Sequence, residues 1–196
     1  MARPSVEPGG LTPAGDLALR RVRRAYERAH VASAARGVAL AIAFTAAAIA
    51  LHRTTQATWL VAAGLAATLA TLGWRGGTWR RGSLAGLLAG VPVFVAPALY
   101  YMFAHGHHCP SCATAPSLMC MLVCLGTSSA VGTAVGYVAM RDASPHRFAG
   151  GALATALLAG LLGCGSVGFG GALGVVIGLV AGGVTGWVVA GRTATA

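Results

Sequence analysis

Charged residues are scarce in this chain of 196 residues, of which 9% are charged and 56% are hydrophobic. Lysine is absent and only four acids occur, so fourteen arginines produce the net charge of +10. The surface of a soluble globule is about a quarter charged, and this chain cannot supply such a surface. The shortage predicts an integral membrane protein and excludes a large soluble catalytic domain.

The apolar runs also lack the residues that transporters and enzymes use. Beyond Arg36, near the start of the first run, they contain no Asp, Glu, Lys or Arg. Coupled transporters and pumps usually keep such residues inside the membrane to bind ions or relay protons. The chain has no glycine-rich phosphate loop, no His-Glu-x-x-His helix and no Gly-x-Ser-x-Gly elbow. We therefore expect no enzyme activity.

Six apolar runs dominate the rest of the sequence, and a membrane helix needs about 20 residues. The runs cover about residues 31–51, 57–74, 83–103, 117–140, 148–163 and 167–190. The predicted fold class is an all-α polytopic membrane helical bundle, with six transmembrane helices in one domain at 31–190. The fifth run is short and the turn after it is tight, which leaves five spans as an alternative. Pro92 and Pro97 are expected to kink the third helix.

The arginines predict the topology. Thirteen of them fall on one side of a six-span arrangement, and Arg53 alone falls on the other. The positive-inside rule therefore places both termini in the cytoplasm and favours an even number of spans. The location predicted is a bacterial inner (plasma) membrane. Because the arginines lie between apolar runs, the charge indicates lipid headgroups or an acidic protein surface, and no direct contact with nucleic acid.

The N-terminal region divides into a tail and a basic helix. Residues 1–15 contain three prolines and three glycines without periodicity, which predicts a disordered tail. Asp16 is a candidate N-cap for a cytoplasmic amphipathic helix over residues 16–36. The helix either binds a partner protein or anchors the chain to anionic membrane lipid. The candidate partner-binding residues are Leu19, Arg20, Arg21, Val22, Arg23, Arg24, Tyr26 and Arg28.

All five cysteines fall on the outer side in this topology. The candidate metal or redox residues there are His105, His107, His108, Cys109, Cys112, Cys120, Cys124 and Cys164. The Cys109–Cys112 pair is a dithiol switch, a ligand set for Zn(II) or Cu(I), or a structural disulfide. Cys120 and Cys124 share one helix face at i, i+4, and their alternative is simple packing as small apolar side chains.

The last run carries a glycine at every fourth position. These helix-packing residues are Gly170, Gly174, Gly178, Gly182 and Gly186. Repeated Gly-x-x-x-Gly removes side chains from one helix face, so that another backbone can approach closely. The partner is either span five or three of the same chain, or the last span of a second copy in a homodimer.

Three stretches together resemble the six-span membrane anti-sigma factors of the NrsF and CarR-like type. They are the arginine-rich helix that leads into span one, a cysteine that opens span four (Cys120, or else Cys124), and the segment 140–164. In the last of these a short basic loop with proline precedes a Gly/Ala-rich span. The resemblance implies a regulator that sequesters a cytoplasmic sigma factor and senses metal or oxidative stress through paired outer cysteines.

By position, the resemblance matches Cys120 and Cys164 to that cysteine pair. Cys164 comes earlier after the loop proline than in the family, and the Trp-Tyr signature that follows is missing. The loop at 105–112 is therefore an alternative detector.

Two other functions remain open. A small soft-metal-ion permease would capture a cation at 105–112 and pass it inward through Cys120 and Cys124. A structural membrane protein would need neither the cysteines nor a partner.

Overall fold

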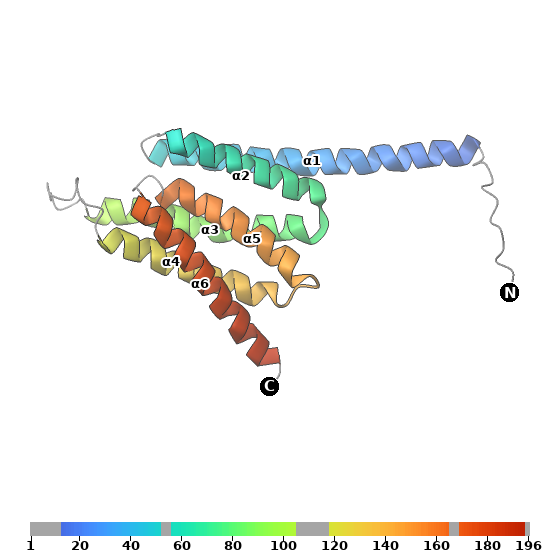
Figure 1. Cartoon of the computed structure of the whole chain (residues 1–196). Helices are drawn as coiled ribbons and strands as arrows, with labels where there is room; N and C mark the ends of the chain where they lie inside the picture. The colour runs from blue at the N-terminus through green and yellow to red at the C-terminus, as the bar shows by residue number, and fades with distance from the viewer. Residues whose placement is uncertain (1–12, 52–55, 105–117, 165–168, 195–196) are drawn as a thin grey trace.

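The computed structural model describes residues 13–51, 56–104, 118–164 and 169–194. Over these residues the chain forms six α-helices (Figure 1). They are α1 (Pro13–Leu51), α2 (Gln56–Arg75), α3 (Gly77–Ala104), α4 (Leu118–Ala139), α5 (Pro145–Cys164) and α6 (Phe169–Ala194). All six are long and apolar enough to cross a membrane, which confirms the all-helical architecture with six candidate spans.

Three helices begin earlier than expected. α1 starts at Pro13 instead of behind a cap at Asp16, because proline is favoured in a first turn, where its missing N–H needs no partner. Residues 13–15 therefore belong to the helix. α3 starts at Gly77, since Gly76 and Gly77 adopt φ of 66° and 56° and make the turn after α2 very short. α5 starts at Pro145, again a first-turn proline.

The helices pack most closely in two pairs, α3 with α5 and α4 with α6. Glycines make both seams possible. A Cβ on Gly82 or Gly86 of α3 would overlap the backbone of α5 at Phe148 and Ala152. Within lipid the hydrophobic effect does not drive helices together, so close backbone approach supplies the packing energy. The glycines of α3 carry the same signal in the sequence, since Gly82, Gly86 and Gly90 also stand four residues apart, but this signal was missed.

The glycines of α6 face α4, and the expectation of span five or three as their partner was wrong. A Cβ on Gly178 would overlap Ser128 of α4, and one on Gly182 would overlap Ser129. Gly170 does not belong to the seam, because a Cβ there would meet nothing within 4 Å. This glycine face is filled within the chain, so a homodimer would need another face of α6.

α1 and α2 lie on the outside of the first pair. Their buried side chains, which include Ala41, Ala48, Leu65 and Leu69, form one core cluster with residues of α3 and α5. The second core cluster joins α3, α4, α5 and α6. The bundle therefore consists of α1, α2, α3 and α5 on one side and the α4–α6 pair on the other.

The described arginines other than Arg36 gather at one end of the bundle, where the N-terminal part of α1, the α2–α3 turn, the α4–α5 turn and the end of α6 lie (Figure 1). Aromatic rings lie beside them. Arg75 lies 5.6 Å from the ring of Trp79, and Arg141 lies 4.5 Å from the ring of Tyr137. Amphipathic rings concentrate where a membrane protein meets water. The arginines therefore lie at one end of the bundle, and the side of the membrane that this end faces stays a prediction.

Candidate redox site

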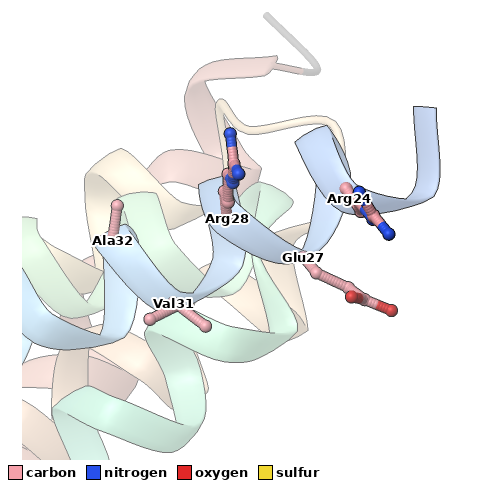
Figure 2. Close-up of a pocket in the computed structure, with 5 residues that line it drawn as sticks. All are labelled: Arg24, Glu27, Arg28, Val31 and Ala32. Atoms are coloured by element: carbon pink, nitrogen blue, oxygen red, sulfur yellow. The ribbon is translucent and has the colours of Figure 1, made fainter. Parts of the chain in front are cut away.

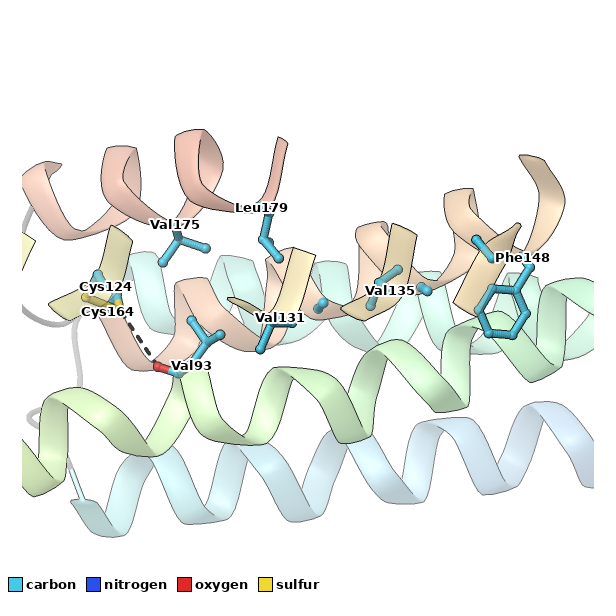
Figure 3. Close-up of a cluster of buried hydrophobic side chains, with 11 residues drawn as sticks. Val93, Cys124, Val131, Val135, Phe148, Cys164, Val175 and Leu179 are labelled. Atoms are coloured by element: carbon cyan, nitrogen blue, oxygen red, sulfur yellow. Dashed lines mark hydrogen bonds between the residues drawn. A yellow bond between two sulfur atoms is a disulfide. The ribbon is translucent and has the colours of Figure 1, made fainter. Parts of the chain in front are cut away.

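A disulfide joins Cys124 of α4 to Cys164, the last residue of α5. The two Cα atoms lie 6.7 Å apart and are separated by 40 residues in sequence. Both cysteines are 0% exposed, and Figure 3 shows them beside the other side chains of the buried cluster. The bond lies at the end of the bundle opposite the arginines, where α5 finishes and α6 begins (Figure 1).

This pairing selects between alternatives that the sequence left open. Cys124 does not pack as a free apolar side chain, and Cys124, not Cys120, is the span-four cysteine bonded to Cys164. Helical geometry accounts for the difference, because Cys124 lies one turn deeper than Cys120 and faces the buried centre of the bundle. The i, i+4 spacing placed both cysteines on one face and could not tell which one reaches α5.

Four helices meet around the disulfide. Val93 of α3 and Val175 of α6 are 0% exposed and belong to the same cluster as the two cysteines. α6 crosses the disulfide with small residues, since a Cβ on Gly174 would lie 3.5 Å from Cβ of Cys124. The sulfur is thus enclosed by apolar groups and by backbone.

The carbonyl oxygen of Val93 on α3 contacts one of the two sulfurs. It lies 3.7 Å from Sγ of Cys164 (dashed in Figure 3). Gly163, beside Cys164, approaches the backbone of Phe94 so closely that a Cβ there would overlap it. The end of α5 therefore packs directly on the backbone of α3 at Val93–Phe94.

Two buried hydroxyls reinforce the helix pairs. The Ser128 hydroxyl lies 3.2 Å from the carbonyl oxygen of Gly174, a contact between α4 and α6, and its shorter contact is with the Cys124 carbonyl of its own helix. Thr155 donates to the carbonyl of Ser83 at 2.9 Å and links α5 to α3. Each bond connects helices within one pair, whereas the disulfide connects one pair to the other. Reduction of the Cys124–Cys164 bond would remove that covalent link.

The structure does not describe the side chains of the other predicted metal or redox residues. His105, His107, His108, Cys109 and Cys112 lie outside the described residues, and Cys120 is in the first turn of α4 without a described side chain. Within the described ranges, no group of three His, Cys, Asp or Glu residues could hold a metal ion. The metal interpretation of the 105–112 loop stays a prediction.

The predicted partner-binding face lies at the opposite end, on α1. Leu19, Val22 and Tyr26 are 53%, 67% and 64% exposed. The first ring contact between α1 and α2 joins His30 to Trp74, whose centroids lie 6.0 Å apart. Residues 13–25 therefore continue beyond the end of α2, as Figure 1 shows.

Comparisons with family models, curated proteins and solved structures give no match for this chain.

Proposed function

We propose that this protein is a redox-responsive regulator of a bacterial inner membrane, which sequesters a cytoplasmic sigma factor. The basic projecting part of α1 and the turns at 75–81 and 141–147 would hold the partner. The observation that carries the proposal is the disulfide between Cys124 and Cys164, which links two helix pairs at the end remote from those arginines. In the proposed topology such a link would connect redox chemistry on the outer side to the geometry of the basic surface on the inner side.

The length and straightness of α1 favour a protein partner over a lipid anchor. Its 39 residues form one continuous helix, which at 1.5 Å per residue measures about 58 Å. A bilayer core is about 30 Å thick, so the helix is far longer than a span requires. Residues 13–25 extend about 20 Å past the bundle in line with the span. A helix that leaves the membrane in this direction holds its arginines away from the headgroups.

The projecting helix offers both charge and apolar contact. Glu27 pairs with Arg23 at 2.9 Å. Within the described residues, Arg20, Arg21 and Arg24 have no carboxylate partner. Arg24 and Arg28 line a hollow on the side of α1 together with Glu27, Val31 and Ala32 (Figure 2). A groove on the partner that is lined by acidic and apolar side chains would be complementary to this face of α1. Binding of a helix in such a groove is a common recognition mode.

The arginines are divided between the two parts of the bundle. Those of α1 and of the α2–α3 turn belong to the side of the bundle that holds α3 and α5, whereas Arg192 belongs to α6 and so to the α4–α6 pair. A change in the angle between the parts changes the spacing of the basic groups. A partner distinguishes two packings only if its binding free energy differs between them. The affinity of the partner would therefore depend on the spacing of these basic groups.

The redox step is a two-electron oxidation. The Cys124 and Cys164 thiols lose two protons and two electrons as the S–S bond forms, and a hydroperoxide accepts them as its O–O bond breaks. Hydrogen peroxide would leave as two waters. A small oxidant suits this site, because both sulfurs are buried. The permease alternative needs Cys124 as a free thiolate, which the disulfide removes.

Partner capture tests the proposal. Wild-type protein solubilised from its native membrane should retain a sigma factor under reducing conditions. V22A/Y26A should lose it, although every charge and the topology are kept. The matched control is L40A/I42A, which removes two exposed side chains from the membrane-spanning part of the same helix and should retain the partner. Failure of the wild type to capture any sigma factor would refute the proposal.

A further inference from the structure

The carbonyl of Val93 lacks the donor that an α-helix ordinarily gives it. In a helix the carbonyl of residue i accepts from the N–H of residue i+4. For Val93 that residue is Pro97, which has no N–H. Val93 is 0% exposed and Pro97 is buried as well, so the carbonyl is shielded from water. A buried carbonyl without its donor is costly, and the cost is greater in a membrane interior.

Sγ of Cys164 is positioned to replace the missing donor. It lies 3.7 Å from the Val93 oxygen, within the range of a sulfur hydrogen bond (Figure 3). A disulfide sulfur has no proton to donate, whereas a thiol has one. The Val93 carbonyl is therefore satisfied by Cys164 only when the disulfide is reduced.

We infer that Cys164 exchanges partners with its redox state, bonded to Cys124 of α4 when oxidised and hydrogen-bonded to the Pro97-released carbonyl of Val93 on α3 when reduced. This inference rests on the proposed redox function, and it specifies the contact through which the redox state of Cys164 changes the packing of α5. Reduction by a dithiol adds two protons and two electrons to the pair, breaks the S–S bond and leaves the dithiol as a disulfide. One new proton remains on Cys164 and points to Val93.

The exchange transfers the end of α5 from one neighbour to the other. In the oxidised form α5 is fixed to α4, and in the reduced form it gains a bond to α3, with which it already packs closely. The carbonyl of Val93 thus favours the thiol state. α3 begins immediately after Arg75 and the Gly76–Gly77 turn, at the basic end of the bundle. A shift of α3 caused at Val93 would therefore also displace the arginines at the start of this helix.

The chain supplies a matched pair of variants. Pro97→Ala returns an N–H to the Val93 carbonyl, which then has a donor in both redox states. Pro92→Ala makes the same substitution in the same helix, but it restores the bond to Leu88. The Leu88 side chain is 73% exposed and Pro92 is exposed, so neither faces the sulfurs.

The experiment measures the reduction equilibrium of the Cys124–Cys164 pair in nanodiscs with a dithiol redox buffer. Cys109, Cys112 and Cys120 are replaced by serine, so that one pair titrates. P97A should lower the ratio of reduced to oxidised protein about fivefold, while P92A should stay within twofold of the parent. Equal ratios in P97A and P92A would overturn the inference. No sigma factor is present, so failed partner capture leaves this result unaffected.

A spectroscopic measurement distinguishes the loss of the hydrogen bond between Cys164 and Val93 from a general change in packing caused by P97A. In the same background, Cys124→Ser leaves Cys164 as the only thiol. Its infrared S–H stretch should lie at lower wavenumber than that of a thiol without an acceptor, and adding P97A should raise it. A stretch that P97A does not move contradicts a bond to Val93, whatever the stability of the variant.

Discussion

Gly182→Ala tests the α4–α6 seam, on which the geometry of the redox site depends. A Cβ on Gly182 would overlap the carbonyl oxygen of Ser129 and approach two further backbone atoms of that residue. Backbone cannot rotate away as a side chain can, so the two helices must separate. Overpacking of this kind costs about 2 kcal/mol of unfolding free energy.

The matched control is Gly126→Ala in α4, where a Cβ would meet nothing within 4 Å. Alanine forms helix more readily than glycine, so this variant should be as stable as the wild type or more stable by up to about 1 kcal/mol. Unfolding in mixed micelles of increasing dodecyl sulfate content, followed by circular dichroism, compares the variants. If G182A and G126A unfold at the same detergent fraction, α6 does not pack on α4 through its glycines.

Two further predictions concern the links within and between the helix pairs. Thr155→Val removes the hydroxyl that bonds the Ser83 carbonyl and should lower the unfolding free energy by about 1 kcal/mol. The control is Thr185→Val, because the exposed Thr185 hydroxyl bonds Ala181 of its own helix. This variant should leave the unfolding free energy unchanged in the same assay. Mass spectrometry of unreduced, oxidised protein should find a peptide linked through Cys124 and Cys164; C120S should keep it, and a Cys120–Cys164 peptide in its place would contradict the structure.

The architecture follows largely from the sequence, because the spacing of apolar runs and the distribution of arginines are local patterns. The helix ends were less predictable. Pro13 and Pro145 begin helices that charge and apolarity alone would start later, since a first-turn proline gives no hydropathy signal. The glycines of α6 were recognised by their spacing, but a bare helix face carries no information about which neighbour it meets.

The sequence narrowed the set of cysteines that could bond to Cys164, but it did not identify the one that does. Cys120 and Cys124 share a face of α4 and lie one turn apart along its axis, so the axial position of α4 against α5 decides which of them lies beside Cys164. That axial position depends on the α4–α6 seam, which is a property of the packed bundle. The contact between Cys164 and the Val93 carbonyl was missed entirely, although Pro97 was a visible signal. A proline inside a span always releases the carbonyl four residues earlier.

The central claim is that the state of the Cys124–Cys164 pair at one end of the bundle sets the affinity of the basic surface at the other. Its direct test is the dissociation constant of the sigma factor for protein in nanodiscs, measured with the pair reduced and with the pair oxidised by hydrogen peroxide. We expect oxidation to weaken binding at least fivefold, which is the lower end of typical allosteric coupling. C164S should bind as the reduced protein does under both conditions. Equal affinity of the reduced and oxidised wild type would contradict the account.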